Sequence, residues 1–507
     1  GLTTKHRGFL APPAVFLALA SLVLHGLANG QYGFHRDELY FIVCGDHPAL
    51  GYVDQPPVVP LLAAWSHAIF GDNLLGFRFL PALTMTAAVS LTAEFTRLLG
   101  GGRFAQWLAG LCVLLAPFFL LEGVLFYTDM FQALTWLGIA WALLRLEQTG
   151  DERWWLAIGA IAGFSLETKY LIAFFLAGLV IGLLATPARR SLLRPWVWLG
   201  ALLGGLIILP NLLWQQAHGW PFLEIGKAGA GGKNVALSPP AYLAQQVILA
   251  GPLASPVWIV GIVASFVRPK PAVTRAFPIA WLIMMIAFIA WHGKAYYLLP
   301  IYPILLALGA TQIEGWIRAG APRGVLLAAV GVSGAATMPL SLPILPVADF
   351  IRYQRMIGFT PSVGERNKTG PLPQYYADMF GWPQMAAEIA KVYDSLPPQD
   401  RARAVFFGEN YGEAAAIDIF GRRFGLPPAI SGHNNYFLWG PHGHDGSVMI
   451  IIGGDPAHYA ALFRSVEVAG HIDNPLAMPY ETDQPIYVLR GMNVPLQRYW
   501  PQVKSFQ

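Results

Sequence analysis

Long apolar stretches separated by short polar segments fill the first two thirds of the chain. Uninterrupted runs near 20 residues, long enough for a helix to cross a bilayer, recur about eleven times before residue 346. The predicted spans are residues 9–29, 75–96, 104–121, 130–146, 154–168, 170–186, 196–215, 243–267, 276–292, 297–317 and 324–345. This pattern predicts a polytopic α-helical membrane protein.

The pattern changes after residue 346, where charged residues, Asn, Gly and Pro return to the levels of a soluble protein. We therefore expect two domains: residues 1–346 in the membrane, with an outer loop at 30–74, and a soluble α/β domain at 347–507. Alternating strand and helix patterns support the second domain, with strands at 404–408, 448–454 and 486–489 and helices at 409–420 and 456–463. Gly453-Gly454 between a strand and a helix is typical of a tight turn, with anion binding as the alternative.

The first span has two interpretations. Lys5 and Arg7 precede it, as in a signal peptide, but its apolar run is long and Gly-Leu-Ala-Asn-Gly is a poor cleavage site. An anchor is favoured.

Basic residues between the spans fall on one side of the membrane, which the distribution of charge identifies as cytoplasmic. These residues are Lys5, Arg7, Arg97, Arg103, Arg145, Arg153, Arg189, Arg190, Arg194, Arg268, Lys270, Arg275, Arg318 and Arg323. With an odd number of spans, the tail is expected outside the cytoplasm.

Composition supports the membrane assignment and narrows the function. Charged residues make up 12% of the chain and apolar residues 55%, which excludes an ordinary soluble enzyme. The net charge of +4 is scattered rather than clustered, so no nucleic-acid partner is expected. Cys44 and Cys112 have no metal-ligand spacing and are interpreted as buried thiols.

Charges in the outer loop need an explanation. His35-Arg36-Asp37-Glu38 follows the first span directly, and the simple interpretation is an interfacial pair of acids solvated by headgroups. The loop continues as an apolar, membrane-facing stretch at 39–44 and a Pro-fixed polar turn at 46–57, which suits the wall of a site at the membrane surface.

Further candidates lie on the same side of the membrane. Asp129 precedes the fourth span, where it could cap a helix. Lys169 lies in a tight hairpin, and Lys294 precedes Tyr296 and Tyr297; each lysine could simply snorkel to the interface. Cations beside hydroxyl groups, with His292 nearby, also fit a phosphate group at the bilayer surface.

Together these motifs resemble a known family. The segments are Arg36-Asp37-Glu38-Leu39-Tyr40, Gly51-Tyr52-Val53-Asp54-Gln55-Pro56-Pro57, Thr128-Asp129 and Tyr296-Tyr297-Leu298-Leu299-Pro300-Ile301-Tyr302-Pro303. In this order they resemble the bacterial branch of the protein O-mannosyltransferase and aminoarabinose transferase family, which are integral-membrane glycosyltransferases of the GT-C class, family 39. The resemblance covers about residues 8–346 and implies 11 to 13 transmembrane helices.

The resemblance implies inverting transfer of a sugar from a polyprenyl-phosphate carrier to an acceptor hydroxyl on the extracytoplasmic face of a bacterial inner membrane. Asp37 matches the family's base, with Glu38 and Asp129 as further catalytic carboxylates. Lys169, Lys294 and Tyr296 would hold the departing phosphate. The full set of substrate-binding candidates is Arg36, His47, Tyr52, Asp54, Gln55, Lys169, His292, Lys294, Tyr296 and Tyr297.

Some questions stay open at this stage. Asp37, Glu38 and Asp129 could supply oxygen ligands to a divalent ion, which the family does not uniformly require. The acceptor could be a glycan, a lipid or a protein, and one sequence does not define the sugar. The alternative function is a transporter or flippase of a lipid-linked sugar, in which charges would lie along a path through the spans.

Overall fold

The computed structural model describes residues 12–267, 271–361 and 368–507. Four basic residues used for the orientation, Lys5, Arg7, Arg268 and Lys270, lie outside the described residues. The chain divides into two compact units. Unit 1 consists of residues 1–31, 75–212 and 236–345, and unit 2 of residues 32–74, 213–235 and 346–507. The outer loop, expected to belong with the membrane helices, is therefore grouped with the tail.

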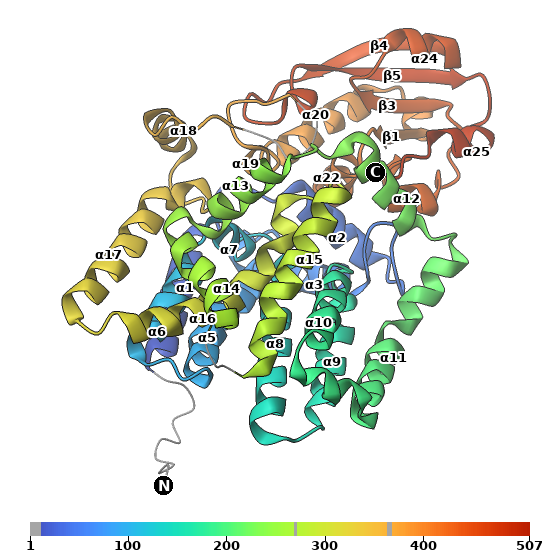
Figure 1. The fold of residues 1–507 in the computed structure, drawn as a ribbon. Coiled ribbons are helices and arrows are strands. Elements are labelled where there is room, and N and C mark those ends of the chain that lie inside the picture. The colour runs from blue at the N-terminus through green and yellow to red at the C-terminus, as the bar shows by residue number, and fades with distance from the viewer. Residues whose placement is uncertain (1–11, 268–270, 362–367) are drawn as a thin grey trace. The chain divides into compact units, whose positions relative to one another are not determined.

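Helices make up unit 1 (Figure 1). They are α1 (Pro12–Ala28), α5 (Phe79–Leu98), α6 (Arg103–Leu115), α7 (Pro117–Glu122), η1 (Thr128–Phe131), α8 (Gln132–Thr149), α9 (Trp154–Leu166), α10 (Ile172–Leu184), η2 (Pro187–Leu193), α11 (Pro195–Ala217, ending in unit 2), α13 (Pro239–Ala250), η4 (Pro252–Ala254), α14 (Ser255–Val267), η5 (Ala272–Arg275), α15 (Ala276–Ala290), η6 (Ala295–Ile301), α16 (Tyr302–Trp316), α17 (Gly320–Thr337) and η7 (Met338–Leu340). Every predicted span overlaps at least one of these helices.

The spans are less regular than predicted. Five helices of the described residues are long and apolar enough to cross a membrane by themselves, or up to seven if each bent pair counts as one span. The predicted span 243–267 is not one helix, because α13 and α14 meet at an angle of 99°. Gly251, with φ of 96°, and Pro252, which cannot donate a backbone hydrogen bond, interrupt it. The span 104–121 is likewise broken before Pro117.

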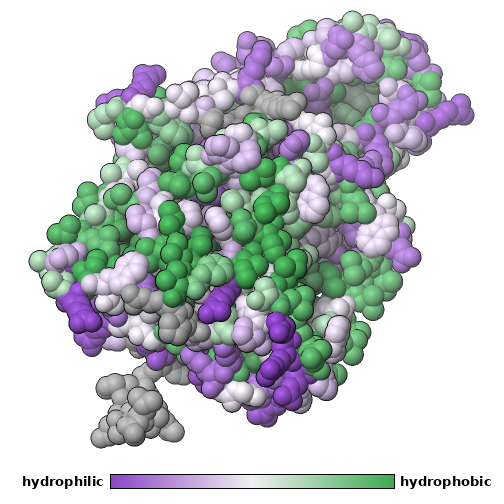
Figure 2. All heavy atoms as spheres, in the orientation of Figure 1, coloured by the Kyte–Doolittle hydropathy of each residue, from purple (hydrophilic) through white to green (hydrophobic). Residues whose placement is uncertain are grey.

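Apolar side chains cover the middle of the unit 1 helices on the face in Figure 2, and hydrophilic residues gather at their lower ends. Several of the exposed side chains are large, such as Trp198 on α11 at 69% and Val332 on α17 at 70%. Exposure of this kind is unfavourable in water and favourable in lipid. The chain is a multi-pass membrane protein.

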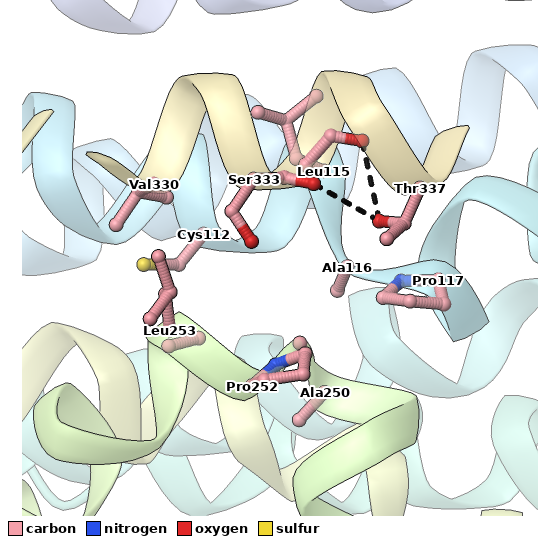
Figure 3. A pocket seen from close by; sticks show the side chains of 13 residues that line it. Cys112, Leu115, Ala116, Pro117, Ala250, Pro252, Leu253, Val330, Ser333 and Thr337 are labelled. Atoms are coloured by element: carbon pink, nitrogen blue, oxygen red, sulfur yellow. Dashed lines mark hydrogen bonds between the residues drawn. The ribbon is translucent and has the colours of Figure 1, made fainter. Parts of the chain in front are cut away.

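A small cavity lies where α13 and α14 bend. Cys112 and Leu115 of α6 line it together with Pro252 and with Ser333 and Thr337 of α17 (Figure 3). Its volume is about 20 Å³, enough for roughly one water molecule. The cavity is too small for a substrate. Cys112 and Cys44 are both buried free thiols, as predicted.

A five-stranded sheet organises unit 2 (Figure 1). Its strands are β1 (Ala404–Gly408), β2 (Ile430–Ser431), β3 (Val448–Ile452), β4 (Phe463–Ile472) and β5 (Gln484–Met492). Its helices are α2 (Arg36–Asp46), α3 (Val58–Phe70), α12 (Pro221–Ala228), α18 (Val347–Met356), α19 (Gln374–Ala377), α20 (Trp382–Ser395), α21 (Pro398–Arg401), α22 (Tyr411–Phe420), α23 (Asn435–Trp439), α24 (Pro456–Leu462) and α25 (Leu496–Tyr499). The short α4 (Leu74–Phe77) follows α3. The predicted α/β character of the tail is confirmed.

The strands run in the order β2-β1-β3-β5-β4. β1 pairs in parallel with β2 and β3, and β5 pairs antiparallel with β3 and β4. β4 was missed because it is a mostly exposed edge strand in which polar residues interrupt the apolar ones, so it lacks an apolar run. Gly453 and Gly454 have φ of 64° and 84°, which confirms the tight turn.

Helix α2 is buried rather than membrane-facing, which corrects the expectation for residues 39–44. Leu39, Tyr40 and Ile42 are at most 1% exposed. α2 packs against α3 and, from the tail, against α22. These helices cover the apolar surface of α2. The same packing places the acidic start of α2 beside the tail domain.

Close glycine contacts hold α14 against α16 in unit 1. A Cβ atom on Gly309 would lie 1.7 Å from the carbonyl oxygen of Val257, and one on Gly261 would lie 2.2 Å from that of Leu305. Small residues that let backbones approach are a common basis of helix packing in membranes.

We predict that Gly309→Ala lowers the free energy of unfolding by about 1–3 kcal/mol, because α14 must move away. Gly315→Ala in the same helix is the control, since a Cβ there meets nothing within 4 Å. It should be neutral or gain up to about 1 kcal/mol of helix propensity. Unfolding curves of both variants in detergent check this, and equal behaviour would contradict the close packing.

Candidate active-site residues

The acidic motif of the outer loop begins α2 in unit 2. The side chain of His35 caps the helix by accepting the backbone N–H of Asp37, with Nδ1 3.1 Å away. Glu38 completes the capping box, since its Oε1 accepts the backbone N–H of His35 at 2.8 Å. Glu38 is 1% exposed. The structure thus gives Glu38 a clear role in holding the start of α2, and its predicted catalytic role stays a prediction.

Asp37 is partly exposed and meets a residue that sequence reasoning missed. The hydroxyl of Tyr411, the first residue of α22, donates a hydrogen bond of 2.6 Å to Oδ1 of Asp37. The guanidinium of Arg36 lies 4.6 Å from the centre of the Tyr411 ring, and its NH1 donates to the hydroxyl of Tyr480 at 3.2 Å. A phenol thus contacts the carboxylate that the sequence proposed as the base, and a cation lies against the ring of that phenol.

The Pro-fixed turn is held from several directions. Asp54 accepts hydrogen bonds from the hydroxyl of Tyr40 at 2.9 Å and from the side-chain amide of Asn434 at 3.3 Å. Burial raises the pKa of Asp54 to about 6, opposed by the Tyr40 hydrogen bond. The hydroxyl of Tyr52 donates to the carbonyl of Cys44 at 2.6 Å. These contacts make Asp54 and Tyr52 framework residues of the loop.

Gln55 and His47 differ in their surroundings. Gln55 is 3% exposed, and its Nε2 has no hydrogen-bond partner in the part of the chain that the structure describes. His47 stacks on Trp439 with 4.3 Å between ring centres. It borders a cavity of about 210 Å³ that Asp418, Arg422 and His442 also line. His47 therefore lines a cavity of unit 2 to which Asp37 and Tyr411 do not belong.

The second group of candidates meets in unit 1. The Nζ of Lys169 lies 2.8 and 2.7 Å from the two carboxylate oxygens of Asp129. It also lies 5.7, 5.5 and 5.1 Å from the ring centres of Tyr127, Tyr296 and Tyr297. The side chain of Asp129 is 2% exposed and that of Lys169 is 19% exposed. Asp129 and Lys169 form a buried ion pair. The simpler interpretations, a helix cap for Asp129 and snorkelling for Lys169, do not describe it.

Lys294 and His292 lie just before the η6 segment. The Nζ of Lys294 lies 5.9 Å from the ring centre of Tyr296, and its backbone carbonyl accepts the Tyr242 hydroxyl at 3.2 Å. His292 is exposed and has φ of 55° in the preceding turn. The structure places Lys169 near Tyr296 and Tyr297, and Lys294 near Tyr296, while the pairing of Lys169 with Asp129 was not predicted.

Glu122 at the end of α7 is a further residue of this cluster. It is 7% exposed, interacts electrostatically with both Asp129 and Lys169, and its Oε2 accepts no hydrogen bond from the described residues. Among the residues that the structure describes, no group of three or more His, Cys, Asp or Glu side chains could hold a metal ion. A divalent ion stays a prediction.

Comparison with known proteins confirms the resemblance. Residues 54–214 match the family described as dolichyl-phosphate-mannose-protein mannosyltransferase. Over 196 residues the chain is 30% identical to lipid A galacturonosyltransferase RgtD of Rhizobium johnstonii, covering 36% of this chain and 39% of that protein. It is 28% identical over 203 residues to polyprenol-phosphate-mannose–protein mannosyltransferase of Corynebacterium glutamicum, covering 33% of this chain and 38% of that protein.

A third relative matches over more of its length. Undecaprenyl phosphate-alpha-4-amino-4-deoxy-L-arabinose arabinosyl transferase 1 of Pseudomonas fluorescens is 24% identical over 325 residues, covering 60% of this chain and 57% of that protein. The matches thus span less than two thirds of each relative.

The fold is similar over nearly the whole chain. The crystal structure of ArnT from Cupriavidus metallidurans bound to undecaprenyl phosphate has a TM-score of 0.60 at 16% identity, covering 94% of this chain and 97% of that chain. The mycobacterial arabinofuranosyltransferase AftD has a TM-score of 0.51 at 12% identity, covering 95% of this chain and 42% of that chain. This likeness confirms the expected GT-C type of fold with a small C-terminal sheet domain.

The buried ion pair generates a test. Lys169→Met would leave the Asp129 carboxylate buried without its cation, and we expect a loss of about 3–5 kcal/mol in the free energy of unfolding. The control is Arg153→Met, which removes an ion pair with Asp151 in which Arg153 is 73% exposed. That change should leave the free energy of unfolding nearly unchanged, because water screens an exposed pair. Chemical unfolding in detergent measures both, and equal losses would contradict a buried Asp129–Lys169 pair.

Proposed function

We propose that this chain transfers a sugar from a polyprenyl-phosphate carrier to an acceptor hydroxyl, with inversion at the anomeric carbon. The single observation that carries the proposal is the setting of Asp37, a partly exposed carboxylate that accepts a hydrogen bond from Tyr411. A hydrogen bond of this kind favours the ionised form, which is the form that can accept a proton.

The comparisons support the class of donor. The three relatives are named for the transfer of galacturonate, mannose and aminoarabinose, and two of the names specify a polyprenyl-phosphate carrier. The ArnT crystal structure holds undecaprenyl phosphate. We extend this donor class to the present chain. The same names include lipid A and protein as acceptors, so the acceptor and the sugar are to be found by assay.

The chemistry requires a base and a site for the leaving group. In our proposal Asp37 takes the proton of the acceptor hydroxyl while that oxygen bonds to the anomeric carbon. The bond from this carbon to the phosphate oxygen breaks, and polyprenyl phosphate leaves with the electron pair. Its growing negative charge needs cations and hydroxyl donors, which can contribute several kcal/mol at such a site.

Unit 1 supplies groups of this kind. Lys294 and Tyr296 lie together, and Lys169 lies against the same tyrosine. Lys169 is held by Asp129, and we assign the phosphate contacts to Lys294, Lys169 and Tyr296 together. Asp129 then acts by holding Lys169 in place, in addition to the predicted role of a second carboxylate near the acceptor. A divalent ion, if bound, would add a further positive charge at the phosphate.

The central test is Asp37→Asn, which keeps the size and most hydrogen bonding of the side chain but removes proton acceptance. We expect turnover to fall by at least about 100-fold, the lower end for general base catalysis. Purified protein is supplied with polyprenyl-phosphate mannose or aminoarabinose and with lipid A or a protein, and release of free polyprenyl phosphate is measured. Movement of intact donor across a vesicle, without release, would instead indicate a flippase.

Asp46→Asn is the matched control, because Asp46 ends the same helix, α2, and pairs only loosely with Arg422 at 3.7 Å. It should keep normal turnover. Full activity of Asp37→Asn together with correct folding would remove Asp37 from the role of base.

The proposed reaction also needs unit 2 outside the cytoplasm. We predict that a reporter fused after Gln507 is active only on the extracytoplasmic side, because the basic residues between the spans favour that orientation. Alkaline phosphatase and green fluorescent protein fusions, which are active on opposite sides, measure this directly. A cytoplasmic signal would refute both the odd number of spans and the proposed location of Asp37.

A further inference from the structure

The tail domain contributes a side chain directly to Asp37. The two residues are 374 positions apart in the sequence, yet both belong to unit 2, and the Tyr411 hydroxyl lies 2.6 Å from Oδ1 of Asp37. We propose that Tyr411 is a positioning residue of the transfer reaction, which orients the Asp37 carboxylate toward the acceptor hydroxyl whose proton it takes. This inference rests on the proposed function of Asp37.

The direction of the hydrogen bond follows from the chemistry of both groups. A carboxylate can only accept, so the phenol donates. Burial, with the nearby Asp37 charge as a second cause, raises the pKa of Tyr411 well above its ordinary value. Tyr411 therefore keeps its proton at neutral pH, and its hydroxyl donates to Oδ1 of Asp37.

His35 holds the backbone of Asp37 in place. Its Nδ1 accepts the backbone N–H of Asp37 at 3.1 Å. His35 thus fixes the backbone of Asp37, while Tyr411 fixes its carboxylate.

Tyr411 is itself firmly held, as a positioning residue must be. Its ring stacks on Tyr40 with 4.3 Å between centres, and the Arg36 guanidinium lies 4.6 Å from the ring centre. Its backbone N–H donates to Nδ1 of His433 at 3.1 Å. These contacts restrict both the ring and the backbone, so the hydroxyl has little freedom to leave Asp37.

The residues flanking Tyr411 tie the start of α22 to the same place. Asn410 caps the helix by accepting the N–H of Glu413, and its Nδ2 donates to Glu481 at 2.7 Å. A Cβ on Gly412 would lie 3.2 Å from both Cβ and Nε of Arg36, so only a glycine allows this close approach without a shift. The start of α22 is therefore built around the start of α2.

A competing interpretation makes a different prediction. If the Tyr411 hydroxyl occupied the place of the acceptor hydroxyl, the acceptor would have to displace it. Removing the hydroxyl would then lower the KM for the acceptor and leave kcat unchanged. A positioning residue has the opposite effect, because an unrestrained carboxylate lowers the rate of the bound complex without changing how substrates bind.

The experiment compares Tyr411→Phe with wild-type full-length protein in detergent, using the donor and acceptor pair that wild type turns over. Tyr411→Phe keeps the ring beneath Arg36 and removes only the hydroxyl. We expect kcat to fall by about 10- to 100-fold, the effect of small misplacements of a reacting group, with both KM values unchanged. Unchanged kcat, with or without a lower KM for the acceptor, would overturn the inference.

Tyr436→Phe is the matched control. Tyr436 also belongs to the tail and donates a 2.6 Å hydrogen bond to a carboxylate, Asp418. Its loss should lower stability to a similar degree and leave kcat unchanged. An equal fall of kcat in both variants would show that Tyr411 acts only through the stability of the tail domain.

A second measurement does not depend on turnover. Unfolding temperatures of Tyr411→Phe, Asp37→Asn and the double variant form a cycle that reports the coupling of the two side chains. We expect non-additive shifts, and additive shifts would overturn the contact. If Asp37→Asn is fully active, the proposed base fails. If it is inactive while Tyr411→Phe turns over normally, only the present inference fails.

Discussion

A carboxylate removed from water must find a cation or hydrogen-bond donors, and this constraint shapes both units of the protein. An unpaired buried charge costs several kcal/mol, which is comparable to the whole stability of a domain. In unit 1 the constraint is met by an ion pair, because Lys169 bridges both oxygens of Asp129. In unit 2 it is met by neutral donors, such as Tyr40 on Asp54 and Tyr436 on Asp418. Asp37 follows the second pattern but stays partly exposed.

The two solutions have different chemical consequences. An ion pair holds charge in place, and the rings of Tyr296 and Tyr297 lie 5.5 and 5.1 Å from the Nζ of Lys169. A carboxylate held by a neutral phenol keeps its negative charge and can still accept a proton at its other oxygen. The first arrangement therefore suits a framework near a phosphate, and the second suits a base. Glu38 shows a third arrangement, since its carboxylate accepts a backbone N–H at the start of its own helix and caps it.

Much of the fold could be predicted from local pattern. Apolar runs near 20 residues located the helices of unit 1, and alternating strand and helix patterns located β1, α22, β3 and α24. The errors also have local causes. The bend at Gly251-Pro252 interrupts a run whose apolar character continues, and β4 is an edge strand without an apolar run. The membrane-facing surface expected at residues 39–44 is buried because α22, far along the chain, covers it.

The sequence by itself determined that the protein lies in a membrane, that a soluble α/β domain follows, and which side chains carry charge into otherwise apolar surroundings. These properties depend on composition and periodicity, which are local. Only the tertiary structure decided the partners of those charges: Lys169 for Asp129, and Tyr411 for Asp37. A hydrogen bond between residues 374 positions apart depends on how helices α2 and α22 pack. No local pattern around Tyr411 distinguishes it from any other tyrosine at the start of a helix.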